Sequence, residues 1–319
     1  MVVGLSDVPE PQLLLFLLFL CIYLVTVGGN LVILIVISCD RRLHTPMYFF
    51  LANLSVIDTV FSSVTVPNLL FILATAQKSM SFRGCITQLS FFQFLVVAEC
   101  YLLAVMAYDR YVAICSPLSY ALIMSQSLRC RLVATCWVSW VLSSLHSTLH
   151  TSIISSLDYC GANKINEHFC DQPPLLSLSC SNPAGYNIVV LTEGSFVAVS
   201  PFIFVVISYS HILKTILNIH SSSGRYQAFS TCSSHLTSVG LFFGAIFFTY
   251  FYPSSSGSVS EERPLSVVYS ILTPLLNPFI YSLRNQQVKR ALKKVTHHRL
   301  SINLILHNCF SLGGLSTLT

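Results

Sequence analysis

Long apolar runs recur along this chain, separated by short polar stretches. Seven runs can be traced, and length rather than periodicity identifies them, because helices buried in a bundle are apolar on most faces. The pattern predicts an all-α protein, a seven-transmembrane helix bundle. The predicted runs are Leu13–Ile37, Tyr48–Ala74, Ile86–Ala107, Leu132–Ile154, Ile188–Leu213, Leu236–Phe251 and Val267–Tyr281.

Composition and charge agree with a membrane location and fix its direction. The chain has 319 residues, of which 54% are hydrophobic and only 9% charged, far below the ~25% of soluble domains. The 17 Lys and Arg residues gather in the loops on one side, since only Lys78, Arg83, Lys164 and Arg263 fall on the other. Basic loops stay cytoplasmic. We therefore expect a multi-pass integral membrane protein, with an extracellular N-terminus, a cytoplasmic C-terminus and no nucleic-acid partner.

A short amphipathic helix is predicted after the seventh run. Apolar residues recur there at helical spacing, and basic residues occupy the other face, so the helix should lie on the lipids of the inner leaflet. We expect residues 1–295 to form the bundle with this eighth helix and residues 296–319 to form a cytoplasmic tail. The apolar positions are Val288, Ala291, Leu292 and Val295, and the basic ones are Lys289, Arg290, Lys293 and Lys294.

An acid and an arginine stand together at the inner end of the third run, as Asp109 and Arg110. Charge is costly near hydrocarbon, so the pair needs an explanation. Arg110 could be an interfacial anchor that reaches the headgroups. Alternatively, Asp109 neutralises Arg110 at the mouth of the bundle, and a partner protein competes for the arginine.

Two more carboxyl groups lie at membrane depth, Asp58 in the second run and Glu99 in the third. Such residues favour a functional hypothesis. Three functional arrangements are open: both are protonated, they share a proton, or they hold a sodium ion. The structural alternative is a cluster of polar side chains whose only role is to fix helix packing. The sequence also favours helix packing for Gly28, Gly29 and Asn30, where small residues allow close approach and an amide can bond across the bundle.

Four cysteines lie on the oxidising side of the membrane. Cys160, Cys170 and Cys180 fall in a long loop, and Cys85 begins the third run. Four cysteines allow three pairings. A metal site with His168 is the alternative, but disulfides are favoured and we expect no metal site.

No motif of an enzyme is present, neither a nucleotide-binding glycine loop nor HExxH nor GxSxG. We therefore expect no catalytic activity. Pro201 and Pro278 interrupt two runs and should bend them, with Asn277 helping to satisfy freed backbone groups. Broken helices with Asp58 and Glu99 also suit a small transporter, although no inverted repeat is visible.

Several motifs, in this order, resemble one known family. The chain is similar to mammalian olfactory receptors, which are rhodopsin-like (class A) G-protein-coupled receptors. The resemblance covers about residues 5 to 295 and is highly specific as a set. The matching stretches are Pro46-Met47-Tyr48-Phe49-Phe50-Leu51 with Asp58, Met106 to Cys115, Ser208-Tyr209, Ala228 to Leu236, and Pro274 to Asn285.

The resemblance implies a function and roles for particular residues. An odorant receptor binds small volatile ligands in a transmembrane pocket and activates a stimulatory or olfactory G protein, which raises cyclic AMP. It implies the disulfides Cys85–Cys170 and Cys160–Cys180, and a sodium or polar site at Asp58 and Glu99, with no other cofactor. The residues implied for the G-protein switch are Asp109, Arg110, Tyr111, Tyr209, Asn277, Pro278 and Tyr281.

The odorant pocket is expected between the outer halves of the third, fifth, sixth and seventh runs. An apolar pocket with few polar groups suits a small volatile, and an amide such as that of Gln93 would orient it. Ordinary bundle packing is the alternative for each position. The expected lining is Phe92, Gln93, Val96, Val97, Val197, Phe243, Phe247, Tyr250 and Ser270.

The chain departs from the family pattern in several places. The only Asn-x-Ser/Thr sequence begins at Asn53, inside the second run where glycosylation cannot reach, and the outer N-terminal segment is short. We expect this to affect trafficking to the cell surface. Gln227 replaces a usual lysine, and Phe243 and Ala245 replace a usual tyrosine and threonine. The first change removes a cytoplasmic charge near the G-protein surface, and the other two affect the activation pivot. A receptor that no longer functions is a further alternative.

Overall fold

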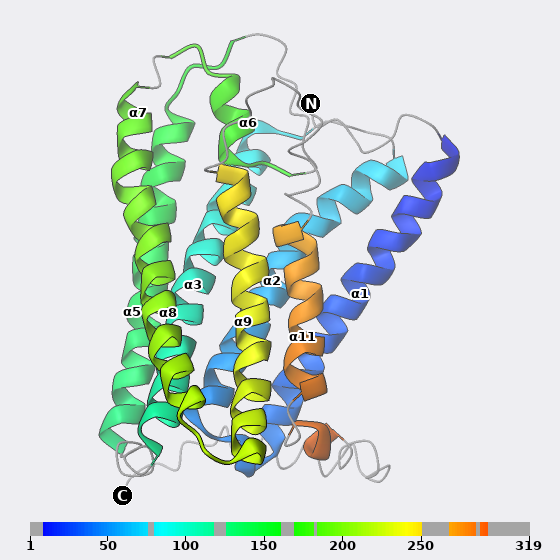
Figure 1. Cartoon of the computed structure of the whole chain (residues 1–319). Coiled ribbons are helices and arrows are strands. Elements are labelled where there is room, and N and C mark those ends of the chain that lie inside the picture. Colours follow the sequence, from blue (N-terminus) through cyan, green and yellow to red (C-terminus); the bar gives the residue numbers. More distant parts are fainter. Residues whose placement is uncertain are drawn as a thin grey trace, which may run out of the picture.

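The computed structural model of the chain is a bundle of long helices (Figure 1). It describes residues 9–75, 80–117, 126–160, 169–181, 184–250, 268–284 and 288–292. The long helices are α1 Pro9–Cys39, α2 Pro46–Thr75, α3 Phe82–Cys115, α5 Gln126–Ser155, α8 Ser195–Leu217, α9 Ser222–Tyr250 and α11 Thr273–Arg284. The short elements are η1 Arg41–Leu43, α6 Gln172–Ser177, α7 Ala184–Val189, and the π-helical turns η2 Val190–Gly194 and η3 Val268–Leu272.

The described part of each of the seven predicted runs lies on helix, so the predicted seven-helix bundle is confirmed. Five described helices are long and apolar enough to cross a membrane by length and composition. The remaining two are α5, which has 30 residues but carries serines and histidines, and α11, which has 12 residues and continues η3.

The sixth helix begins well before the predicted start. The apolar run begins at Leu236, whereas α9 begins at Ser222. The added turns are rich in serine, which gives no hydrophobic signal. They are helical because backbone hydrogen bonds continue past the end of the apolar stretch. This extension carries the inner part of α9 beside α8, where the two helices are joined by a short turn.

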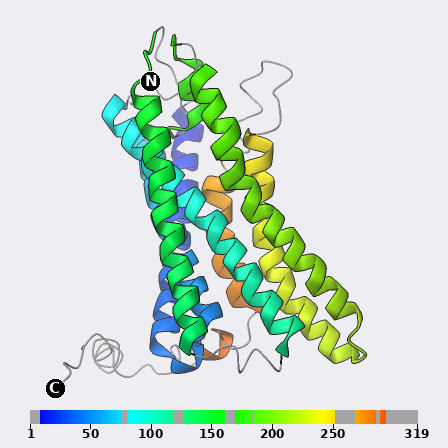
Figure 2. The same ribbon diagram turned by 90° about the vertical axis from the view of Figure 1, so that its left-hand side faces the viewer.

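Helix α3 is the centre of the bundle. It packs against α2, α5, α8 and α9, and it crosses the bundle obliquely (Figure 2). Its N-terminus is capped by Ser81, whose side chain accepts a hydrogen bond from the Gly84 amide, as expected for an N-cap serine. Its buried face runs along nearly its whole length, which places the charged inner end of α3 inside the protein.

The outside of the bundle is covered by exposed apolar side chains. Leu14 of α1 is 70% exposed, and Phe196 of α8 is 69% exposed. An exposed apolar surface of this extent is unfavourable in water and suits contact with lipid tails. The outer surface therefore agrees with a protein that spans the membrane.

Both predicted disulfides are present at one end of the bundle. Cys85 is bonded to Cys170, and Cys160 is bonded to Cys180. A backbone bridge between Tyr159 and Ser179 lies beside the second disulfide. Burial raises the pKa of the Tyr159 phenol, which donates a hydrogen bond to the Ile154 carbonyl at 2.6 Å. Disulfides form in oxidising compartments, so this end of the bundle is the outer one.

The eighth helix is present at residues 288–292. Val288 and Ala291 are buried and join the hydrophobic core, with Leu292 packed against it. Lys289 and Arg290 are exposed. The described turn is therefore amphipathic as predicted. The other predicted positions, Val295, Lys293 and Lys294, and the tail at 296–319 lie outside the described residues.

Candidate functional site

The inner end of α3 holds the acid and arginine that the sequence singled out. Asp109 is 3% exposed and Arg110 is 9% exposed, although both are charged residue types that are almost never fully buried alone. The Tyr111 ring packs edge-on against His211 of α8, with ring centroids 5.8 Å apart. Burial of Arg110 inside the helix bundle distinguishes it from an anchor that reaches the headgroups.

Aromatic side chains from the neighbouring helices surround Arg110. The Tyr209 hydroxyl of α8 lies 2.9 Å from His235 Nδ1 of α9, and the two rings are stacked. Tyr281 of α11 is 7% exposed. The Arg110 guanidinium interacts electrostatically with these three side chains. The structure therefore brings the predicted switch residues of α3, α8 and α11 together, and adds His235, which the sequence analysis did not single out.

A buried polar network connects α2, α9 and α11 at the middle of the bundle. The Asn277 amide nitrogen donates to both carboxylate oxygens of Asp58, at 3.2 and 3.0 Å. Its amide oxygen accepts a hydrogen bond from Ser238 at 3.0 Å. The three side chains are 2% exposed or less. Asn277 therefore joins three helices, which is a different role from the predicted one of bonding freed backbone groups.

The backbone group freed by Pro278 is satisfied from α1 instead. Proline has no amide hydrogen, so the carbonyl four residues earlier lacks its usual partner. That carbonyl belongs to Pro274, and the Asn30 amide donates to it at 3.2 Å. Gly29 favours the close approach, because a Cβ there would lie 3.3 Å from Pro278 Cβ and would make a tight contact. The predicted packing role of the Gly-Gly-Asn stretch thus has a specific partner, the part of α11 that contains Pro274 and Pro278.

Glu99 lies close to this network and is 2% exposed. It interacts electrostatically with Asp58, so the structure brings the two predicted carboxyls together. One Glu99 carboxylate oxygen has no hydrogen-bond partner among the described residues. Oxygen ligands of this kind suit a hard cation or a shared proton, so the residues present fit the sodium ion that the resemblance implies.

The predicted odorant-contacting residues fall into several environments. The Phe92 ring packs between Phe61 and Phe169, with centroids 5.3 and 4.8 Å away. Gln93 is 5% exposed, and neither its amide nitrogen nor its amide oxygen has a partner among the described residues. Unpaired buried amides are rare in native proteins because each costs free energy. Gln93 is therefore the predicted residue with the clearest capacity to bind a ligand.

The other predicted lining residues are spread over four elements. Val96 and Val197 are half-buried, Val97 and Ser270 are buried, and Phe247 is 57% exposed. The Phe243 ring packs against Phe202 of α8 at 5.4 Å. The side chain of Tyr250 lies outside what the structure describes.

Gln88 ties the outer disulfide to the bundle, and sequence reasoning missed it. Its amide nitrogen donates to the Val64 carbonyl of α2 at 2.8 Å, and its amide oxygen accepts from the Cys170 backbone at 2.9 Å. The disulfide loop is thus held against α2 as well as α3. The metal alternative for this loop involves His168, which lies outside the described residues, and Cys170 Sγ is bonded to Cys85.

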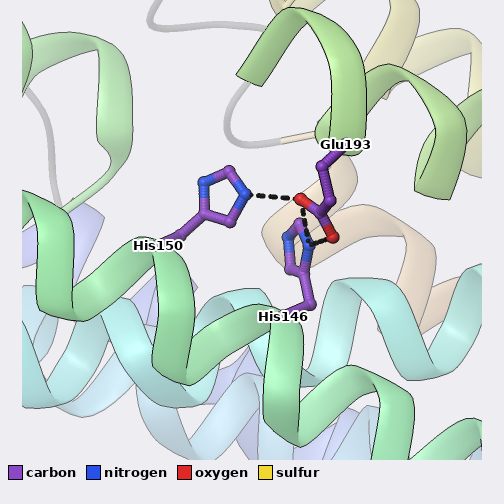
Figure 3. A group of neighbouring side chains, drawn as sticks. All are labelled: His146, His150 and Glu193. Carbon is purple, nitrogen blue, oxygen red and sulfur yellow. Dashed lines mark hydrogen bonds and ion pairs between the residues drawn. The ribbon is translucent and has the colours of Figure 1, made fainter. Parts of the chain in front are cut away.

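A second polar cluster lies between α5 and the start of the fifth span, and it was also missed. His146 and His150 of α5 face Glu193 of η2 (Figure 3). The signal available in the sequence is the spacing of four residues between two histidines, which places both on one helix face. Glu193 could not be assigned to them, because only the tertiary structure places the fifth span beside α5.

The seven-helix architecture, the outer disulfides and the buried arginine at the inner end of α3 define a G-protein-coupled receptor. The chain belongs to the olfactory receptor family, whose profile matches residues 19–299. It is 50% identical to gorilla olfactory receptor 1G1 over 292 residues, 92% of each chain. It is 47% identical to human olfactory receptor 1F1 over 295 residues, 92% of this chain and 94% of the relative.

A third relative, human olfactory receptor 10A2, is 48% identical over 305 residues, 95% of this chain and 98% of the relative. Membership in this family makes the protein an odorant-binding, multi-pass membrane receptor that couples to a G protein, and not an enzyme. The same finding decides against the transporter alternative.

Proposed function

We propose that this receptor responds to small volatile odorants by activating a G protein of the stimulatory or olfactory type, which raises cyclic AMP. The observation that carries the proposal is Arg110, buried at the inner end of α3 and surrounded by aromatic side chains of α8, α9 and α11. A buried arginine at the inner face can be exposed only by moving those helices. Helix movement would therefore couple odorant binding to the G protein.

Activation is a population shift between two arrangements of the bundle. A ligand that binds the open-inner-face arrangement more tightly moves the equilibrium toward it. In the closed arrangement, Tyr209 bonds His235 beside Arg110. In the open one, we propose that Tyr209 and Tyr281 stabilise the exposed face while Arg110, with Asp109 and Tyr111 beside it, engages the G protein. Asn277 and Pro278 form the pivot.

The odorant would bind in the outer half of the bundle, with the Gln93 amide orienting it. The support is that both polar atoms of this buried amide lack partners among the described residues. A hydroxyl or carbonyl on the odorant would supply the missing hydrogen bond, and the apolar groups would supply burial. The apolar and small residues proposed to complete the lining are Phe92, Val96, Val97, Val197, Phe243, Phe247, Tyr250 and Ser270.

We assign Asp58 and Glu99 as the residues that would hold a sodium ion or a shared proton in the closed arrangement. The unpartnered Glu99 oxygen and the electrostatic interaction between the two carboxyls support this assignment. The Asn277 amide holds the Asp58 carboxylate in place. A cation between the helices would favour the arrangement in which they are close together.

The test is cyclic AMP in cells that express the full chain, measured across a panel of odorants. Arg110→Ala should abolish the response to an active odorant while the amount of surface receptor, measured with an antibody, stays within about twofold. The matched control is Arg83→Ala, which removes an exposed arginine at the outer end of the same helix.

Loss of the response in the Arg110 variant alone would support the proposed switch. Retention of the response in that variant would overturn the switch role. If surface receptor is confirmed and the active odorant raises calcium without cyclic AMP, the stimulatory type of G protein is wrong while the receptor assignment stands.

A further inference from the structure

Three residues of the kinds that bind metal ions lie together near the outer end of α5 (Figure 3). His146 Nδ1 lies 2.8 Å from Glu193 Oε1 and 3.1 Å from Oε2. His150 Nε2 lies 2.7 Å from Glu193 Oε2. One nitrogen from each imidazole and one carboxylate oxygen therefore converge, and all lie within 4.8 Å of one another.

Local structure explains how three residues from two segments converge. The two histidines are separated by one helical turn on α5, and their rings lie side by side with centroids 4.3 Å apart. Glu193 belongs to the π-helical turn η2, which joins α7 to α8. A π-helical turn changes the direction in which its side chains point, and such turns are frequent at functional sites. Here the turn directs the carboxylate of Glu193 toward both imidazoles.

The donor set matches the preference of zinc. Zinc binds imidazole nitrogen at about 2.0–2.1 Å and carboxylate oxygen at about 2.0–2.2 Å, in tetrahedral geometry. Two tetrahedral ligands at these bond lengths are about 3.3 Å apart, a value that follows from the same bond lengths. The nitrogen-to-oxygen separations of 2.7 and 2.8 Å would need to open by roughly half an ångström. Rotation of side chains on two adjacent helices can supply a change of that size.

A second residue orients one of the two imidazoles. The Tyr186 hydroxyl lies 3.3 Å from His150 Nδ1, and the rings meet edge to face. Metal-binding histidines commonly make such a bond through their other nitrogen, since it fixes the tautomer and the ring orientation. Tyr186 and His150 are 3% and 1% exposed. The His150 side of the cluster is thus buried and already oriented with Nε2 toward Glu193.

The opposite side of the cluster is open. The side chain of Glu193 is 34% exposed and that of His146 is 10% exposed, whereas that of His150 is 2% exposed. Three protein ligands with an accessible side leave a fourth position for water or another small ligand. Since Tyr186 packs in the same hydrophobic cluster as the Cys85–Cys170 disulfide, the accessible side is at the outer end of the bundle.

We propose that His146, His150 and Glu193 form a zinc site, which binds Zn²⁺ from the extracellular side and clamps α5 to the start of the fifth span. When the ion binds, the lone pairs of His146 Nδ1 and His150 Nε2 point toward it, and each imidazole carries its one proton on its other ring nitrogen. The ion also neutralises a carboxylate that is otherwise costly at the membrane boundary. Because protons compete for the same nitrogen atoms, zinc affinity falls as the pH is lowered.

The direct test is zinc binding to the purified full chain in detergent, with ZnCl₂ as the probe. Equilibrium dialysis followed by metal analysis gives the number of ions bound per receptor, and the thermal unfolding midpoint is followed in parallel. We expect His146→Gln and Glu193→Gln each to bind one zinc ion fewer per receptor than the original chain. The control His220→Gln removes an exposed histidine at the inner turn between α8 and α9, and should leave the stoichiometry unchanged.

A third variant separates a metal site from a hydrogen-bonded cluster. Glu193→His removes the carboxylate that accepts both hydrogen bonds but supplies a third imidazole ligand. Zinc binding should persist in this variant within about tenfold of the original affinity, and zinc should still raise the unfolding midpoint. A cluster held only by hydrogen bonds to the carboxylate would lose its stability in Glu193→His and gain nothing from zinc.

The free cysteines require one further measurement, because thiolates also bind zinc. The cysteines outside the disulfides include Cys21, Cys39, Cys100, Cys115, Cys136 and Cys232. Alkylation with N-ethylmaleimide before dialysis blocks the accessible thiols, so that they can no longer bind zinc. A bound ion that survives alkylation and is lost in both Gln variants supports the site. Equal zinc binding by the original chain and both Gln variants, or no zinc binding by any of them, overturns the proposal.

Discussion

Two clusters in this bundle are centred on a carboxylate, and they differ in what surrounds it. Asp58 is fully buried, and its two oxygens accept hydrogen bonds from the neutral amide of Asn277. Glu193 is one-third exposed, and its oxygens face two imidazoles. The first cluster joins three helices at the middle of the bundle, whereas the second joins two segments near its outer end.

The difference decides what each cluster can do. The Asn277 amide does not ionise. Solvent and ions can reach a fully buried network only if helices move. The Asp58 network therefore reports on helix arrangement. Imidazoles exchange protons for metal ions, and partial exposure gives an ion a path in. The Glu193 cluster can therefore respond to the composition of the extracellular fluid while the bundle keeps its arrangement.

Removal of the central amide should have the largest effect on stability. Asn277→Leu leaves the Asp58 carboxylate without its amide donor and the Ser238 hydroxyl without its acceptor. We expect a loss of about 2–3 kcal/mol, the cost of unsatisfied buried polar groups, measured as a lower unfolding midpoint of the purified receptor. Asn68→Leu is the matched control, because the Asn68 amide nitrogen has no hydrogen-bond partner in the described part of the chain. Equal losses in the two variants would mean that the network adds nothing.

The outer cluster should be less important for the fold when zinc is absent. Glu193→Gln removes the charge but keeps the size of the side chain, at a site where solvent can replace part of the lost interaction. We expect a loss of about 1 kcal/mol in the presence of a chelator, because hydrogen bonds at an exposed site contribute little. A loss as large as that of Asn277→Leu would show that both clusters hold the fold, and the proposed distinction between them would fail.

Removal of the Ser238 hydroxyl from the central network should have the smallest effect. Ser238→Ala removes one hydroxyl that donates to Asn277 across two helices, and interhelical bonds of this kind contribute about 0.6 kcal/mol on average in a membrane protein. Ser143→Ala is the control, since Ser143 is also fully buried but donates to Ser139 within its own helix. The midpoint should fall more in Ser238→Ala than in Ser143→Ala. A larger fall of the midpoint in Ser143→Ala would mean that the hydrogen bond from Ser238 to Asn277 does not stabilise the network.

Much of the architecture could be predicted from the sequence, because transmembrane helices are encoded locally. Seven apolar runs predicted seven helices, and basic loops predicted their direction. Motifs that include Asp109-Arg110 and Asn277-Pro278 predicted the receptor family. The amphipathic pattern at 288–292 predicted which side of that turn is buried. The start of α9 could not be found, since its first turns are polar and carry no hydrophobic signal.

What the sequence alone determined, then, are properties of single segments: which stretches span the membrane, which residues carry charge into it, and which family they represent. Only the tertiary structure decided the partners. Asn30 bonds the carbonyl that Pro278 leaves free, although 244 residues separate it from Pro274. Glu193 meets two histidines more than 40 residues away. Such pairings depend on how helices pack side by side, and helical periodicity within one segment carries no information about which neighbour it will face.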